Sequence, residues 1–387
     1  MTKIRIAIFI TTFLVVVSVG YVVALLARGY RIDTEKLSFT PRGLLVANSD
    51  PDAAQVIIDG ELKTATNTTI SLPPGEYAVS LKKDGFLEWN KSLVIEKEIV
   101  TQIDAVLFSS APSLSALTFS GAFEPVISPD SNKIAYGVPE NGLTTQAGLW
   151  VTETVNLPIG FNREPRQVTD GDLSEASWQW SPDSREILLT TKTGIFLLDA
   201  GEFTSENQRI NVAAQKETIL TKWQETKKKK LTAQLSKLPD ELQTIFETKT
   251  KDIVFSPDEN KILYTSTAST QIPEGLIKSL PAASTQHQER NIKPDKKYVY
   301  DTKEDRNFEV AGSNQVTYWL PTSAHIIIPQ EDKITIMDYD ATNQQEIYSG
   351  SYLAPHAYPY SSGSRLIILT NLGSSEGFPN LYLLNLK

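Results

Sequence analysis

The chain has 387 residues, which is enough for two or three domains, and its formal net charge is −9. It contains no cysteine, and this excludes disulfides, thiol nucleophiles and zinc–thiolate sites. The acidic balance argues against nucleic acid as a partner, because phosphate recognition needs a basic surface.

A membrane anchor is predicted at the N-terminus. Residues 6–27 form an uncharged run of 22 residues that is rich in Ile, Val, Leu and Phe. About 20 apolar residues span a bilayer core, whereas the apolar region of a signal peptide has ~7–15. A cleaved signal peptide is the lesser alternative, because Leu25 stands where cleavage needs a small residue. Residues 1–5 would then be a cytoplasmic tail and residues 28–42 a polar tether.

The charges that flank this run do not decide its orientation. Lys3 and Arg5 precede the run, and Arg28, Arg31 and Lys36 follow it. A short tail before a long folded body favours a cytoplasmic N-terminus. We therefore expect a single-pass protein of the cell membrane with an extracytoplasmic body.

Residues 43–109 have the pattern of a small β-sandwich. Short apolar stretches alternate with turn signals about every 8–12 residues, and one of these signals, Asp59-Gly60, is typical of a two-residue hairpin. The stretches are 44–48, 54–60, 68–72, 78–86, 92–95 and 101–107.

This part of the chain resembles a PEGA domain. The resemblance lies in residues 48–51, the hairpin at 56–60 and the turns at 73–77 and 82–86, although Pro-Gly-Glu-Tyr stands where Pro-Glu-Gly-Ala is usual. PEGA domains are typical of prokaryotic cell-surface and membrane-anchored proteins. The resemblance therefore implies that the body lies outside the membrane.

Within residues 110–387 one turn-and-strand phrase occurs five times. Proline sets φ at the first corner of the turn, Ser or Asp oxygens accept from free turn amides, and β-branched or aromatic residues follow. A second apolar strand lies downstream of each copy, which is typical of β-propeller blades. Three strong copies begin at Ser128, Ser181 and Ser256, and two weaker copies begin at Leu320 and Tyr360.

These copies resemble the Ser-Pro-Asp type of WD40-like repeat found in TolB-like propellers. We expect five blades, or six if an insertion hides one. Residues 112–120 are expected to supply the outer strand of the last blade beside residues 381–386, which would join the two ends of the domain and remove exposed sheet edges. The predicted fold class is all-β: a transmembrane helix, a PEGA-like sandwich and a propeller.

Two insertions interrupt the repeats. Residues 213–248 place apolar side chains near helical spacing, broken at Pro239, and predict a helical hairpin that projects from the propeller. Residues 266–295 are rich in Ser, Thr, Pro and Gln and predict a flexible loop.

The first insertion holds the candidate partner-binding residues. They are Trp223 and the basic run Lys227, Lys228, Lys229 and Lys230. The run would make electrostatic contact with an anionic lipid or a wall polymer. The competing interpretation, which the sequence alone favours, is an ordinary solvated helix face.

No catalytic, cofactor-binding or metal-ligating set is recognisable in the sequence. The three histidines, His287, His325 and His356, lack metal-ligand spacing. Neither a Gly-x-Ser-x-Gly elbow nor a phosphate-binding glycine motif occurs. The aspartates of the turn phrase are expected to cap turns, and the tryptophans of the repeats to pack blades.

Two classes of function stay open, with a purely structural envelope protein as a third. The first is a membrane-anchored binding or scaffold protein, not an enzyme, whose propeller and insertions contact an envelope protein or cell-wall polymer. The alternative is an envelope enzyme that cleaves glycans with two channel carboxylates about 5–10 Å apart. The order of anchor, PEGA domain and propeller resembles that of a PEGA-domain protein family found in bacteria with reduced genomes. This resemblance implies no catalytic residue.

Overall fold

The computed structural model describes residues 2–27, 30–33, 38–140, 147–155, 164–278, 284–374 and 377–387. The chain divides into two units. The first comprises Met1–Leu107 and Leu280–Gln286, and the second comprises Phe108–Ser279 and His287–Lys387.

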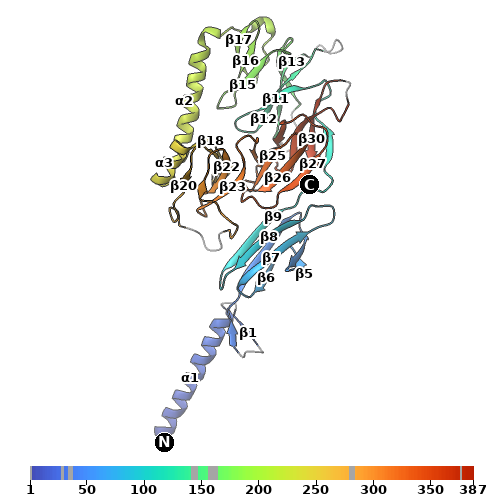
Figure 1. Cartoon of the computed structure of the whole chain (residues 1–387). Coiled ribbons are helices and arrows are strands. Elements are labelled where there is room, and N and C mark those ends of the chain that lie inside the picture. The colour runs from blue at the N-terminus through green and yellow to red at the C-terminus, as the bar shows by residue number, and fades with distance from the viewer. Residues whose placement is uncertain are drawn as a thin grey trace. The chain divides into compact units, whose positions relative to one another are not determined.

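The N-terminal helix α1 spans Thr2–Ala27 (Figure 1). Among the described residues it is the one helix long and apolar enough to cross a membrane. A helix satisfies every backbone polar group internally, as a hydrocarbon environment requires. A short hairpin of β1 (Arg31–Asp33) and β2 (Ser38–Thr40) follows it in the chain.

The rest of the first unit is a sandwich of two sheets, as predicted. Asp59 and Gly60 connect two of its strands with φ values of 51° and 81°, the double left-handed conformation that a two-residue hairpin turn requires. Alternate strand residues, such as Leu45, Val56 and Leu81, fill the core between the sheets. One sheet has the order β6 (Thr68–Leu72), β3 (Gly43–Asp50), β9 (Val100–Val106), and the other β5 (Glu61–Ala65), β4 (Gln55–Ile58), β7 (Gly75–Lys82), β8 (Trp89–Ile95).

The described residues of the second unit form five antiparallel sheets of three or four strands, one for each turn phrase. Sheet 1 is β11 (Phe123–Ile127), β12 (Lys133–Val138), β13 (Gly148–Glu153) and β14 (Arg166–Asp170). Sheet 2 is β15 (Ser177–Trp180), β16 (Glu186–Thr191) and β17 (Gly194–Asp199). Sheet 3 is β18 (Thr250–Phe255), β19 (Lys261–Ser266), β22 (Lys296–Asp301) and β23 (Arg306–Gly312). Sheet 4 is β24 (Tyr318–Trp319), β25 (His325–Pro329), β26 (Lys333–Asp338) and β27 (Gln345–Ser349).

Sheet 5 contains strands from both ends of the unit, as the sequence predicts. It comprises β28 (Ala357–Pro359), β29 (Arg365–Thr370), β30 (Asn380–Asn385) and, as its edge strand, β10 (Ser113–Ala116). Ser113 pairs with Asn385 in this register. The backbone N–H of Ser361 also donates to the carbonyl of Thr154 at 3.1 Å, which joins sheet 5 to sheet 1.

The five turn phrases share one backbone conformation. In each, the N–H of the first residue donates to the carbonyl of the sixth, and the N–H of the fourth donates to the carbonyl of the first. In the strong copies the first serine also donates to the aspartate, at 2.5 to 2.6 Å, and accepts the N–H of the sixth residue. The fourth residues all have positive φ: Ser131, Ser184, Glu259, Ser323 and Gly363.

Two tryptophans join neighbouring sheets from equivalent positions just before the phrase. Trp180 donates its indole N–H to the carbonyl of Val126 at 2.9 Å, between sheets 2 and 1. Trp319 does the same to the carbonyl of Val254 at 3.3 Å, between sheets 4 and 3. The tryptophans of the repeats thus pack between blades, as predicted.

The fourth residue of the phrase, which has positive φ, forms a second hydrogen bond at each of the same two junctions. The N–H of Asp130 in sheet 1 donates to Ser184 Oγ of sheet 2 at 3.2 Å. The N–H of Asp258 in sheet 3 donates to Ser323 Oγ of sheet 4 at 3.0 Å. One phrase therefore shapes its own hairpin and also binds the next sheet.

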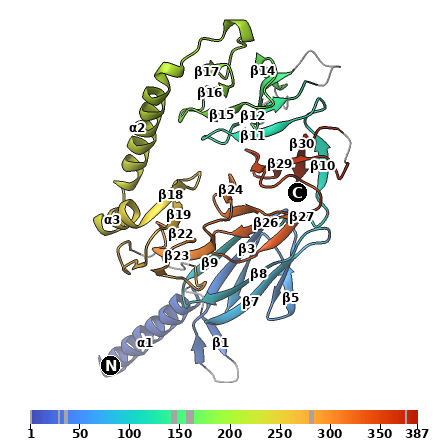
Figure 2. The same cartoon turned by 45° about the horizontal axis from the view of Figure 1, so that its top comes forward.

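The junction between sheets 2 and 3 is built differently. Phe255 stands in sheet 3 at the position where sheets 2 and 4 have tryptophan, and its ring has no N–H to donate. Among the residues that the structure describes, no hydrogen bond joins sheet 2 to sheet 3. Figure 2 shows the five sheets in an arc with a helix running between the arc's two ends. The blade number therefore stays a prediction.

The first insertion supplies that helix and covers the face of sheet 3 that lacks a neighbouring sheet. It contains a short 3₁₀ turn at Ala213–Gln215, α2 (Lys216–Leu235) and α3 (Asp240–Lys249). Phe246 of α3 is fully buried against Tyr264 of sheet 3, with ring centroids 5.1 Å apart. Glu259, at the left-handed position, accepts from Gln234 at 2.9 Å and from Lys237 at 2.9 Å. The end of α2 thus takes the place of a neighbouring sheet.

The second insertion is anchored to the same core, so the expectation of a flexible loop is wrong for residues 266–278 and 287–295. Ile272 and Ile292 are fully buried beside two short strands, β20 (Thr270–Gln271) and β21 (Asn291–Ile292). Arg290 is buried too, donates to the carbonyl of Pro273 at 2.6 Å, and lies 3.3 Å from the carboxylate of Asp305. A few buried side chains hold a segment whose overall composition is polar.

We predict that Trp180→Phe destabilises the second unit more than Trp178→Phe does. Both changes remove the same part of a buried ring, but only Trp180 loses a hydrogen bond, because the described residues give the Trp178 indole N–H no partner. The difference in the free energy of unfolding should be about 1 kcal/mol. Denaturant unfolding of the two variants measures it, and equal costs would contradict the role of the Trp180 bond.

Candidate functional site

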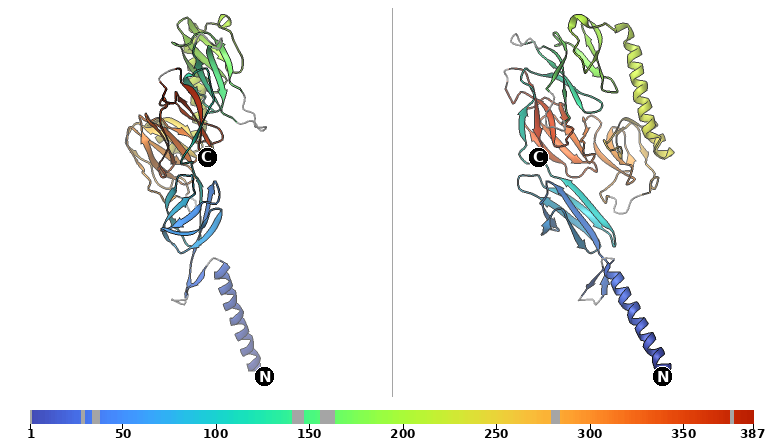
Figure 3. Two further views of the ribbon diagram at one scale, coloured as in Figure 1. Left: turned by 90° about the vertical axis from the view of Figure 1, so that its right-hand side faces the viewer. Right: turned by 180° about the vertical axis from the view of Figure 1, so that it is seen from behind.

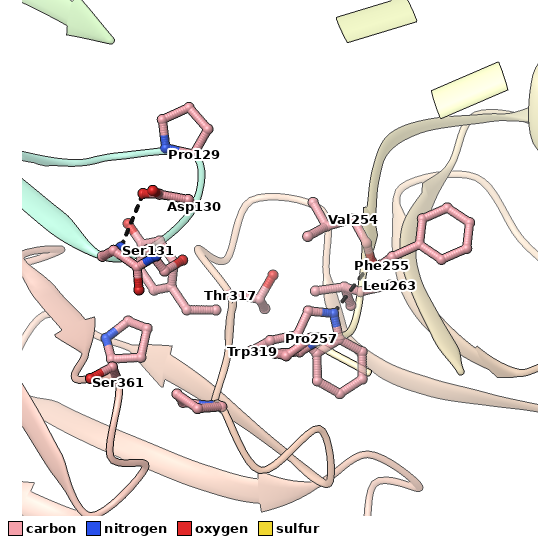
Figure 4. A pocket seen from close by; sticks show the side chains of 14 residues that line it. Pro129, Asp130, Ser131, Val254, Phe255, Pro257, Leu263, Thr317, Trp319 and Ser361 are labelled. Carbon is pink, nitrogen blue, oxygen red and sulfur yellow. Dashed lines mark hydrogen bonds between the residues drawn. The ribbon is translucent and has the colours of Figure 1, made fainter. Parts of the chain in front are cut away.

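A pocket of about 540 Å³ lies where sheets 1, 3, 4 and 5 converge (Figure 4). It is formed mainly by the turns and first strands of these sheets, together with Leu263 of the second strand of sheet 3, and no residue of sheet 2 lines it. The lining residues are Pro129, Asp130, Ser131, Asn132, Val254, Phe255, Pro257, Leu263, Thr317, Tyr318, Trp319, Pro321, Pro359 and Ser361.

Much of the pocket wall is apolar because of the repeated phrase. Pro129, Pro257 and Pro321 are the second residues of three copies, and all three line the pocket. Val254 is 52% exposed, although it belongs to a strand. The ring of Trp319 is held beside it by the hydrogen bond to the Val254 carbonyl. These side chains form a rigid apolar surface suited to binding.

The charged group of the pocket is the carboxylate of Asp130. Its Oδ1 accepts from Ser128 Oγ at 2.5 Å and from the N–H of Asn132 at 3.1 Å. Partial burial alone would raise the pKa of Asp130, but these hydrogen bonds outweigh it and lower the pKa below its usual value. The group is therefore ionised at neutral pH and presents a negative charge to a ligand.

Tyr318 adds a neutral polar group to the wall. Burial raises its pKa to about 12, so its hydroxyl keeps its proton at neutral pH. Its ring meets Tyr358 of sheet 5 edge to face at 5.6 Å, and the Tyr358 hydroxyl donates to the carbonyl of Pro125 at 2.5 Å. This side of the pocket is thus fixed by contacts among sheets 1, 4 and 5.

The predicted partner-binding residues lie elsewhere, on α2. Lys227, Lys228, Lys229 and Lys230 are exposed, whereas Trp223 is only 9% exposed. None of the five lines the pocket. Their role stays a prediction.

The three histidines are not brought together. His325 is buried, with Nδ1 2.8 Å from Thr322 Oγ1, and His287 is exposed. Burial lowers the pKa of His356, whose Nδ1 lies 2.8 Å from the Tyr358 hydroxyl. Within the described parts of the chain, no group of three or more His, Cys, Asp or Glu side chains could hold a metal ion.

Sequence reasoning recognised the turn phrase but not the pocket that it builds. A signal was present, since proline recurs at the second position of the phrase and the phrase stands before the second strand of each sheet. The sequence predicts Asp130 only as a turn cap. It is one, and its carboxylate also lines the pocket.

Comparison with protein families identifies the first unit's sandwich. Residues 42–110 match the PEGA domain. The match contains all seven strands of the two sandwich sheets, β3 to β9, and the predicted resemblance to PEGA is confirmed. A comparison with curated proteins found no match.

Solved structures similar to this chain include two TolB proteins. A putative TolB from Agrobacterium tumefaciens has 12% sequence identity over 69% of this chain and 74% of its own, with a TM-score of 0.23. TolB from Acinetobacter baumannii has 13% identity over 89% of this chain and 64% of its own, with a TM-score of 0.23. An oligogalacturonate lyase in complex with manganese has 11% identity over 85% and 81%, also at 0.23. The propeller architecture rests on the sheets and turns described above.

We predict that Asp258→Asn makes the stability of the second unit less dependent on pH in the acidic range. Partial burial would raise the pKa of Asp258, but hydrogen bonds from Ser256 and Asn260 lower it to about 2. A lowered folded-state pKa gives stability that is present above about pH 4 and is lost as the pH falls towards 2. Unfolding midpoints measured between pH 5 and 2 should fall less steeply for the variant.

Ser256→Ala provides the control for this effect. It removes the donor to Asp258, so its stability should be lower at pH 5 and should also fall less steeply than that of the wild type. Parallel curves for all three proteins would show that Asp258 is not responsible.

Proposed function

We propose that this chain is a membrane-anchored, extracytoplasmic binding or scaffold protein. The central pocket would bind an extended protein segment, and the first insertion would provide a second contact for an envelope partner. The single observation that carries the proposal is the pocket itself, which combines a rigid apolar wall with one ionised carboxylate.

The anchor and the PEGA domain support the cellular setting. Helix α1 has the length and composition of a membrane span, and residues 42–110 match PEGA. In the proposed arrangement this helix would hold the body that follows it in the chain at the membrane. The chain crosses the membrane once in this arrangement, with its N-terminus in the cytoplasm. The extracytoplasmic body then contacts envelope proteins or polymers.

The composition of the pocket favours binding over glycan cleavage. Glycoside hydrolysis in most families uses two carboxylates on opposite sides of the bond. The described residues that line this pocket include one carboxylate, that of Asp130. An apolar wall beside a single fixed charge suits a protein segment that presents an apolar side chain and a cationic group.

The pocket proposal is tested by a photoreactive residue placed at Val254 of the full chain in its membrane. Val254 is exposed in the pocket, so we expect one discrete protein adduct. The matched control is the same residue at Ile210, which is 80% exposed in the same unit but lies outside the pocket. Equal adducts at both positions, or none at Val254, would contradict the proposal.

A second variant tests the charge. Asp130→Asn keeps the size of the side chain and its ability to accept from Ser128, but it removes the negative charge. If a cationic segment occupies the pocket, the yield of the Val254 adduct should fall several-fold. An unchanged yield would show that the ligand does not use this carboxylate.

The orientation is tested by cysteine labelling, which the absence of native cysteine makes unambiguous. Lys192→Cys places a thiol at an exposed position of the second unit, and Lys3→Cys places one in the N-terminal tail. A membrane-impermeant maleimide added to intact cells should label the first variant only. Labelling of Lys3→Cys alone would reverse the proposed orientation.

A further inference from the structure

The middle of α2 is exposed on every side. All side chains of residues 224–230 are exposed, whereas Trp223 on one flank and Leu235 on the other are buried. The helix therefore has buried or half-buried side chains up to Trp223 and again from Leu231, and the two turns between them have none. The right-hand view of Figure 3 shows α2 as one continuous helix.

The basic run occupies this exposed stretch. Successive helical residues are rotated by about 100°, so four consecutive lysines point to all sides of the helix. A charged run usually occupies one solvated face of a helix whose opposite face packs against the protein. Residues 227–230 have no such packed face, so the interpretation as an ordinary solvated helix face does not describe them.

The four ammonium groups are only weakly compensated within the protein: the charge of Lys230 helps to lower the pKa of Glu259, and Glu225 lies one helical turn before Lys228 and Lys229. Among the described residues, none of the four has a carboxylate within ion-pair distance. The chain as a whole carries a formal charge of −9. Four adjacent cations repel one another on a helix, and an external anion would relieve this repulsion.

The distribution of the charges favours a flexible chain over a flat surface. A lipid bilayer approaches a helix from one side and would meet only some of the four lysines at a time. A single small anion could not contact groups that point in four directions. A linear polymer with regularly spaced phosphates can follow the helix surface and contact several lysines together.

We propose that residues 224–230 of α2 bind a flexible phosphate polymer through Lys227, Lys228, Lys229 and Lys230. The inference rests on the proposed binding function and names the chemistry of its second contact. The site is separate from the central pocket, so the Val254 adduct and the polymer measurement can fail independently.

The test uses the full chain in nanodiscs of zwitterionic lipid, with long-chain inorganic polyphosphate as the probe. Affinity is measured by fluorescence anisotropy between 50 and 200 mM salt. If four charges are neutralised on a flexible polyanion, the affinity of the wild type should fall roughly 50-fold over this range. The variant with all four lysines changed to Gln should lose both the affinity and most of this salt dependence.

Two control variants separate the site from overall charge. Changing the four lysines to Arg keeps the charge and should preserve binding. Changing Lys63, Lys97, Lys192 and Lys303 to Gln lowers the net charge by the same amount at other exposed positions and should leave binding nearly unchanged. Gln is a good helix former, so circular dichroism of the variants should match that of the wild type.

Several results would overturn the proposal. Wild-type binding that is undetectable at 50 mM salt would do so, as would unchanged binding by the Gln variant at the run. An equal loss in the distal Gln variant would show a nonspecific charge effect. Tighter binding to anionic vesicles than to polyphosphate, dependent on the same lysines, would replace the polymer with a lipid surface.

Discussion

The left-handed fourth residue of the repeated turn is the constraint on which the second unit depends. It reverses the chain so that the first and sixth residues pair, and this pairing sets the register of the first two strands in each sheet. An L-residue in this conformation costs about 1 kcal/mol. Serine and aspartate oxygens in the strong copies offset the cost by accepting turn amides. The last copy lacks that pair and has Gly363, which adopts positive φ without steric cost.

The same residue couples the turn to the assembly of the sheets. In sheets 2 and 4 it is a serine that accepts an amide from the preceding sheet, whereas in sheet 3 it is Glu259, which accepts from the end of α2 and from Lys237. A sheet face that lacks a neighbouring sheet must be covered or polar. Helix α3 and the second insertion cover sheet 3. The helical insertion is therefore part of the core, with the middle of α2 left exposed.

Much of this fold could be predicted because its signals are local. The turn phrase contains its own hydrogen-bonding groups, Asp59-Gly60 determines a hairpin, and the strand of residues 112–120 was expected beside the last strand. The anchoring of the second insertion was missed because Ile272 and Ile292 are isolated apolar residues in a polar segment, buried by partners distant in sequence. The pocket was missed for the same reason, since four separate sheets contribute to it. Burial of Trp223 could not be derived from helical spacing alone.

The two candidate contacts carry opposite charges, and this limits what each can bind. Asp130 remains ionised in the pocket because hydrogen bonds stabilise its carboxylate, so a polyanion is repelled there. The four lysines of α2 repel a cationic segment in the same way. The pocket and the lysine run have no residue in common. Under the two proposals, charge repulsion would direct a cationic protein segment and a phosphate polymer to different parts of one unit, so that both could be bound at once. A scaffold that joins two kinds of envelope component needs this separation.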